Sequence, residues 1–251
     1  MTNCKVVLSY DGTNFVGWQI QKEGRTVQGE VQRSLEIMHK HPVSVTAAGR
    51  TDSGVHAAGQ VINFRTDIDT IPWERFCVAL SSFLPRDIHP LHSMSVDDRF
   101  HARFSAQLRI YRYVWFMGPT LPADLRFTVG HLRHRPSVAR LNALCRPLLG
   151  LHDFSTFTPP TEPSENRMRE IQRAVFYPLR GLLVFEIAAN AFLWRMVRSI
   201  AGTLIELDKL DAKPIEVEQR LSARDHSSAG PSAPAVGLSL HHVEYPAEYM
   251  A

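Results

Sequence analysis

Asp52 is a lone carboxylate within a segment of small residues. Residues 47–64 read AAGRTDSGVHAAGQVINF, and Arg50, Asp52 and His56 are almost the only charged or titratable groups among them. A carboxylate presented in this way can act as a nucleophile or a general base. It can equally accept hydrogen bonds from the backbone amides of its own turn. The residue types leave both interpretations open.

The flanking residues place Asp52 in a tight loop between two strands. The β-branched run VSVTA at 43–47 and the alternating run GQVINF at 59–64 both predict strands. Gly49 and Gly54 bracket the loop and allow backbone dihedrals that a Cβ would forbid, which lets a ligand approach the main chain. We therefore expect the Asp52 side chain to be presented to a ligand.

An arginine lies inside the apolar pattern of a later helix. The stretch NAFLWRMVRSIAGTLIEL predicts a helix from Phe192 to about Leu207, with Arg198 within its apolar run. Because an unpaired buried charge is costly, a buried Arg198 needs a carboxylate partner, and Asp52 is a candidate. The alternative is that Arg198 faces outward from the helix.

An aromatic strand supplies a third group of candidate residues. In LRIYRYVWF, period-two alternation places four side chains on one face, which are Arg109, Tyr111, Tyr113 and Trp115. Aromatic side chains beside arginines on a strand are typical of proteins that stack unpaired bases. The alternative is a second buried face, which accounts for Tyr113 and Trp115 better than for Arg109.

The elements that position these residues predict an α+β fold of two ferredoxin-like units. The first half has the order β-α-β-β-α-β, with strands at 5–10, 43–47, 59–64 and 88–96 and helices that begin near Thr26 and Pro72. The second half repeats the order, with strands at 106–116, 172–179, 182–189 and 236–245 and helices at 137–148 and 192–207. We expect subdomains at 1–104 and 105–251, with their antiparallel sheets side by side.

The basic residues favour an RNA partner by their kind and their distribution. The formal net charge is only +3, but 23 of the 28 basic residues are arginines, whose planar fork suits phosphates and base edges. The stretches 99–112 and 125–152 contain arginines and no acidic residue. Such stretches are typical of a nucleic-acid surface, although arginine-rich composition on a solvated face gives the same pattern.

The sequence also disfavours several classes of protein. It contains no run of about 18 apolar residues and no signal peptide, so we expect a cytoplasmic protein without a membrane span. The three cysteines are far apart, which disfavours zinc and disulfides. The pairs His131/His134 and His241/His242 have no third ligand nearby, so no metal is expected. No phosphate loop or dinucleotide fingerprint occurs, and no cofactor is expected.

Eight blocks of sequence resemble the tRNA pseudouridine synthase A family and follow that family's order. They are YDGTNFVGWQIQ, TVQGEVQRSL, AAGRTDSGVHAAGQV, RFHARFSA, YRY, HDFSTF, ANAFLWRMVRSIAG and GLSLHHVEYP, and together they span nearly the whole chain. One such block is a weak signal, whereas eight in order identify the family. The loops at 159–169 and 222–234 are the parts least similar to it.

The resemblance implies an isomerase that converts uridine to pseudouridine at positions 38, 39 and 40 in the anticodon stem-loop of tRNA. Its catalytic aspartate corresponds to Asp52, and its active-site tyrosine to Tyr111. Its aspartate-pairing arginine corresponds to Arg198, and Arg50 to an arginine that the family uses at the RNA. The target base must be flipped out before its glycosidic bond is broken. Asp52 then either attacks the sugar or removes a sugar proton. The family also implies a homodimer with a central cleft that holds the tRNA.

Two rival functions fit parts of the pattern. A non-catalytic RNA-binding module accounts for the basic stretches. It does not explain Asp52 in its glycine-flanked loop, because a carboxylate repels phosphate. The triplet Asp52-Ser53-Gly54 resembles the signature of aspartic proteases, which need two such carboxylates sharing a proton. The sequence has no second copy, and its helix-rich pattern does not fit an all-β protease. The isomerase is therefore the predicted function.

Overall fold

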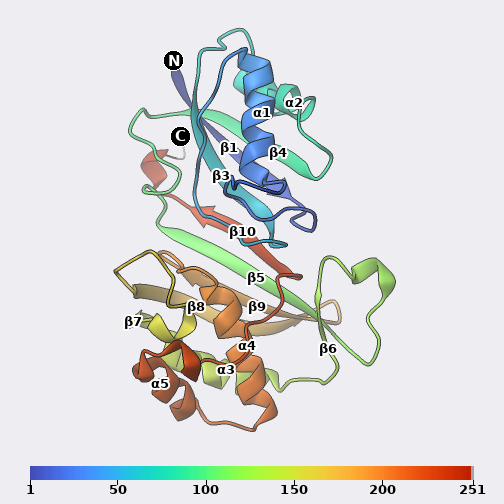
Figure 1. Ribbon diagram of the computed structural model, residues 1–251, viewed down its shortest axis with the longest axis vertical. Helices are drawn as coiled ribbons and strands as arrows, with labels where there is room; N and C mark the ends of the chain where they lie inside the picture. The colour runs from blue at the N-terminus through green and yellow to red at the C-terminus, as the bar shows by residue number, and fades with distance from the viewer. Residues whose placement is uncertain (250–251) are drawn as a thin grey trace. The chain divides into compact units, whose positions relative to one another are not determined.

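The computed structural model describes residues 1–249, which divide into two compact units. The first unit contains Met1–Gln107 together with the C-terminal residues from Ser239 on, and the second is Leu108–Leu238. Each unit combines strands and helices, so the chain is of the α+β class (Figure 1). The last strand, β10 (Leu238–Glu244), therefore joins the unit built from the first part of the chain.

The first unit is a sheet with two helices. Its elements are β1 (Thr2–Tyr10), α1 (Val27–His39), β2 (Thr46–Ala47), β3 (His56–Thr66), α2 (Trp73–Ser81) and β4 (Ile88–Val96). The strand order is β4-β1-β3-β10, and β2 also pairs with β3. All these pairs are antiparallel except that of β10 with β3. Helix α1 begins directly after Thr26, near the predicted start, and the Thr26 hydroxyl accepts a hydrogen bond from Gly29 N (3.2 Å).

The second unit is a sheet with three helices. Its elements are β5 (Leu108–Met117), β6 (Gly130–Leu132), α3 (Val138–Cys145), β7 (Gly150–Asp153), β8 (Met168–Leu179), β9 (Leu182–Ala189), α4 (Met196–Lys209) and α5 (Pro214–Ala223). The strand order is β5-β9-β8-β7, and β6 pairs with β5. The predicted β8–β9 hairpin turns at Arg180 and Gly181, which have φ of 49° and 80° as a tight primed turn requires.

Some predicted elements differ in extent from those observed. The strand predicted at 43–47 is reduced to Thr46–Ala47, while the buried Val43 and Val45 side chains precede it. The helix predicted from Phe192 begins at Met196, because Arg195 has a left-handed φ of 58° that a helix cannot contain. Strands β6 and β7 and helix α5 were not expected. Helix α5 carries a readable start signal, since Lys213 N donates to Glu216 Oε1 (3.0 Å).

The aromatic face of β5 is part of the core of the second unit. Tyr113 is fully buried, Trp115 is 2% exposed, and their rings stack at 4.0 Å. The stack continues from Trp115 to Phe176 (6.2 Å) and from Phe176 to Phe185 (4.4 Å). The expectation that this face stacks on bases is therefore wrong for Tyr113 and Trp115, because β8 and β9 supply further rings that cover them. The alternative of a second buried face is correct here.

The structure contains buried thiols and no membrane-length helix. Cys4, Cys77 and Cys145 are free and buried, and burial raises the pKa of Cys4 and Cys145 to about 12. Within residues 1–249, no helix is long and apolar enough to cross a membrane. In the same residues, no group of three or more His, Cys, Asp or Glu side chains is arranged to hold a metal ion.

Candidate active site

The loop that carries Asp52, residues 48–55, is held by the segment that follows β1. Gly17 and Asp52 form an isolated antiparallel bridge, and Trp18 N donates to Thr51 O (3.0 Å). The buried hydroxyls of Tyr10 and Thr51 are hydrogen-bonded at 2.8 Å. The main chain of Asp52 is therefore fixed on the side of β1, and its half-buried side chain starts from a rigid base.

The C-terminal half of the Asp52 loop is held in the same way. Gly54 N donates to Phe15 O (3.2 Å), and Val55 N donates to Asp52 O (3.1 Å). Of the two glycines that bracket the loop, Gly54 has the left-handed φ of 76°, whereas Gly49 does not. The carbonyl of Gly49 instead accepts a hydrogen bond from Gln60 Nε2 (2.7 Å). Only one of the two glycines thus needs its conformational freedom.

Replacing Gly17 by alanine is expected to damage the Asp52 loop. Gly17 has φ of +117°, and a Cβ there would lie 2.9 Å from Thr51 O. We expect a loss of about 1–3 kcal/mol in the free energy of unfolding, measured by urea denaturation. The control is Gly181→Ala, which has φ of +80° and no atom within 4 Å of its Cβ. Equal losses in the two variants would show that the contact with the Asp52 loop contributes nothing.

Tyr111 and Arg198 lie in the second unit. Tyr111, on β5, is 8% exposed, and its ring meets the ring of Phe192 edge to face at 5.2 Å. Arg198 is half-buried in the first turn of α4. Its Nε donates to Ala233 O (2.8 Å), and Ala233 N donates to Arg198 O (3.0 Å). Arg198 is therefore anchored to the main chain of a neighbouring segment, and does not extend freely into solvent.

The segment that anchors Arg198 belongs to the loop at 222–234. The hydroxyl of Tyr113 donates to Pro234 O, and Gly230 N donates to Thr203 Oγ1 (2.9 Å). A Cβ at Gly202 would lie 1.8 Å from Pro231 O, so this loop packs directly on α4. The isolated glycine within the helical pattern was the readable signal of this close approach.

The four predicted site residues are divided between the two units. Arg50, which is exposed, and Asp52 belong to the first unit, whereas Tyr111 and Arg198 belong to the second. The first unit thus offers a carboxylate for acid–base or nucleophilic chemistry. The second offers an aromatic ring and an anchored cation. The pairing of Asp52 with Arg198 remains a prediction from the sequence.

Comparisons with known proteins identify the family. A family model described as tRNA pseudouridine synthase matches residues 6–105 and 144–246. A tRNA pseudouridine synthase A of Treponema denticola is 44% identical over 99% of this chain and 94% of its own length. Proteins of the same name from Anoxybacillus flavithermus and Coxiella burnetii are 42% and 39% identical, over 98% and 99% of this chain and 99% and 95% of theirs.

The chain belongs to the tRNA pseudouridine synthase family. It is therefore an isomerase, and the reaction is the conversion of uridine in tRNA to pseudouridine. The matched residues include Arg50, Asp52 and Arg198, whereas Tyr111 lies between the two matched stretches.

Proposed function

We propose that this chain isomerises uridines 38, 39 and 40 in the anticodon stem-loop of tRNA, with Asp52 as the catalytic residue. The observation that carries this proposal is the Asp52 loop, whose main chain is held by Gly17 and Trp18. A carboxylate on so rigid a base can be directed at one atom of the sugar. The names of the relatives support tRNA as the substrate.

The first step is to take the target base out of its stack. A base within the anticodon arm is inaccessible until its nucleotide is flipped into the enzyme, at a cost of a few kcal/mol. Arg50 is exposed and lies two residues before Asp52. Its guanidinium can enter the space that the base leaves and bind the displaced backbone.

Asp52 then acts in its ionised form. It either attacks the sugar as a nucleophile or removes a sugar proton, and in both routes the C1′–N1 bond breaks. The uracil turns and C5 bonds to C1′. In the first route the bond between Asp52 and the sugar breaks as this bond forms, and in the second the sugar regains its proton. The proton on C5 is then lost and N1 gains a proton. Pairing with Arg198 balances the charge of this carboxylate and helps to hold it in place. No oxidant or reductant is consumed, since the product is an isomer of the substrate.

Tyr111 stacks on the flipped base, and its hydroxyl assists removal of the proton from C5. We therefore expect Tyr111→Phe to keep the affinity for tRNA and to lose only the part of the rate that proton transfer contributes, about 10²-fold. Tyr111→Ala should lose the rate and weaken binding as well, because the stacked ring is removed. Single-turnover rates and the Kd for tRNA separate the two effects. Equal losses in both variants would contradict a stacking role.

The proposed architecture follows from the same assignment. Two ferredoxin-like subdomains hold the tRNA in a central cleft. One carries the Asp52 loop, and the other carries the Tyr111 strand and the Arg198 helix. The β-α-β-β-α-β order at the start of the chain supports the first of these units. We further propose that the protein acts as a cytoplasmic homodimer, with no metal or cofactor in the reaction.

Tritium release tests the proposed function directly. The wild-type protein is mixed with tRNA that carries tritium at uridine C5, and released label is counted with time. We expect release from transcripts that retain uridines 38–40. We expect no release from transcripts with cytidine at those positions. Tight binding without release would leave an RNA-binding protein on an enzyme fold, which is the alternative function.

A further inference from the structure

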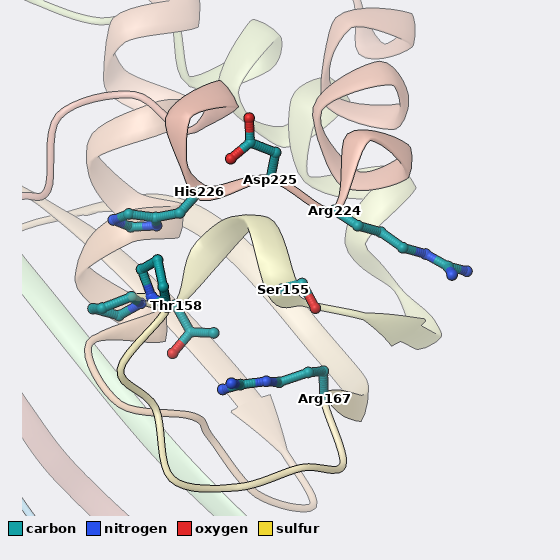
Figure 2. Close-up of a pocket in the computed structure, with 8 residues that line it drawn as sticks. Ser155, Thr158, Arg167, Arg224, Asp225 and His226 are labelled. Atoms are coloured by element: carbon teal, nitrogen blue, oxygen red, sulfur yellow. The ribbon is translucent and has the colours of Figure 1, made fainter.

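A small polar pocket lies in the second unit and involves none of the four predicted site residues. It has a volume of ≈ 160 Å³, and its walls come from residues 155–167 and from the segment 224–226 (Figure 2). This is several times the volume of one water molecule, about 30 Å³. It is well below the roughly 300–1,000 Å³ of pockets for drug-sized ligands. The space suits a single small group such as a phosphate.

Arg167 at this pocket, and Arg169 two residues further along the chain, have donors without acceptors. Arg167 lines the pocket, and its Nη2 donates to Glu162 O (3.0 Å). Its Nη1 is buried and has no hydrogen-bond acceptor within the described residues, and the same is true of Arg169 Nε. Burial lowers the pKa of Arg169, and the charge of Arg167 lowers it further, although Glu162 acts in the opposite direction. An anion beside Arg167 would supply an acceptor for its guanidinium and offset the repulsion between the two arginines.

The nearby carboxylates are already engaged by other donors. Asp153 accepts hydrogen bonds from the amide (2.9 Å) and the hydroxyl (2.6 Å) of Ser155, and lies 3.5 Å from Arg224 Nε. Asp225 accepts from the amide (3.1 Å) and the hydroxyl of Ser227. Glu162 accepts from two main-chain amides. The acids therefore do not supply the acceptors that the buried N–H groups of Arg167 and Arg169 need.

His226 adds an acceptor to the pocket. Its Nδ1 lies 3.0 Å from Thr156 O, so this nitrogen carries the proton and donates to the carbonyl. In the neutral ring Nε2 is then an acceptor. Figure 2 shows Arg167 extending toward Thr158, and His226 lies beyond Thr158 as seen from Arg167. Arg224 extends away from both. A guanidinium donor and an imidazole acceptor at one pocket match a phosphate joined to a ribose that bears a 2′-hydroxyl.

We propose that this pocket binds a phosphodiester of the tRNA backbone, with Arg167 donating to the phosphate and His226 accepting from an adjacent ribose hydroxyl. The proposal rests on the tRNA substrate of the proposed function, but not on the role of Asp52 or on the uridine modified. Both walls lie largely in the loops at 159–169 and 222–234, which are least similar to the family. The contact adds affinity for tRNA and takes no part in the chemistry.

The salt dependence of tRNA binding tests the proposal. For Arg167→Gln we expect the slope of log K against log salt to fall by about 1, and the Kd at 0.15 M salt to rise roughly 5- to 10-fold. Arg167→Lys keeps the charge and should keep most of the slope. The control Arg75→Gln removes an exposed arginine from α2 and should leave the slope unchanged. Thermal unfolding of each variant shows whether the loop stays folded.

A second arm separates RNA from free phosphate. Inorganic phosphate is titrated into the full chain at constant ionic strength, and amide resonances of residues 155–158 and 224–226 are followed by NMR. Shifts in the wild type that are lost in Arg167→Gln, together with the lower slope, support the proposal. Phosphate shifts with an unchanged slope would mean a site for a free anion and overturn it, and so would an unchanged slope without shifts. Tritium release is measured in a separate assay. A negative result there would count against the proposed isomerase activity and would leave the conclusion about phosphate binding at this pocket unchanged.

Discussion

Asp52→Asn is expected to abolish tritium release from tRNA, with a fall in rate of at least about 10³-fold. Asparagine has the shape of aspartate but cannot attack a sugar carbon as an anion or hold a proton taken from it. The affinity for tRNA should change less than about threefold, because a carboxylate contributes nothing to the attraction of phosphates. Single-turnover release and a Kd by filter binding measure the two quantities on the same preparation.

The Asp52 loop makes this variant easy to interpret. None of the hydrogen bonds described above for this loop uses the Asp52 side chain, so the substitution leaves them in place. Asp69→Asn is a matched control, since Asp69 is an exposed aspartate in the same unit. Near-normal turnover by Asp52→Asn would remove Asp52 from the mechanism. A large fall with Asp69→Asn would show that the assay reports general damage.

The periodic elements of the fold could be predicted from the sequence because they are long and bounded by clear signals. Helix α1 begins after a capping threonine, and the β8–β9 hairpin turns at a residue pair that adopts positive φ. Short elements were missed for the opposite reason. The strand β6 has three residues and β7 has four, which is too few for a period to emerge.

The aromatic strand shows where periodicity is insufficient. Alternation correctly separates the two faces of β5, but it does not say what covers each face. Tyr113 and Trp115 are buried because Phe176 and Phe185, more than sixty residues later, stack beside them. Such long-range packing depends on strand order, which local patterns do not encode. The candidate role in RNA binding is thereby withdrawn for Tyr113 and Trp115 on this face.

The residues of the candidate site could be chosen from the sequence by their chemistry. The main-chain groups that hold those residues in place could not. Asp52 and Arg198 stand out because each is a charge in an apolar or small-residue setting. Their anchors are main-chain carbonyls and amides, which every residue has, so no side-chain pattern marks them. The structure adds Gly17 beneath Asp52 and Ala233 beside Arg198 as the positions that hold the charged residues in place.

Arg198→Ala is expected to reduce both activity and stability. The half-buried guanidinium donates from Nε to Ala233 O at 2.8 Å, and a hydrogen bond from a charged donor contributes about 1–3 kcal/mol. Because Arg198 is partly exposed, we expect a loss at the lower end, about 1–2 kcal/mol in the free energy of unfolding. The variant also removes the proposed ion pair with Asp52, so the rate of tritium release should fall at least about 10²-fold.

Arg198→Lys and Arg198→Gln separate the two contributions. Lysine keeps the charge but lacks the Nε donor, so it should restore more of the activity than of the stability. Glutamine keeps a neutral donor and much of the stem, so it should restore more of the stability than of the activity. Urea denaturation and single-turnover release measure the two effects. A fully active, equally stable alanine variant would argue against the ion pair with Asp52, and a variant that loses stability alone would make Arg198 an anchor for α4 and nothing more.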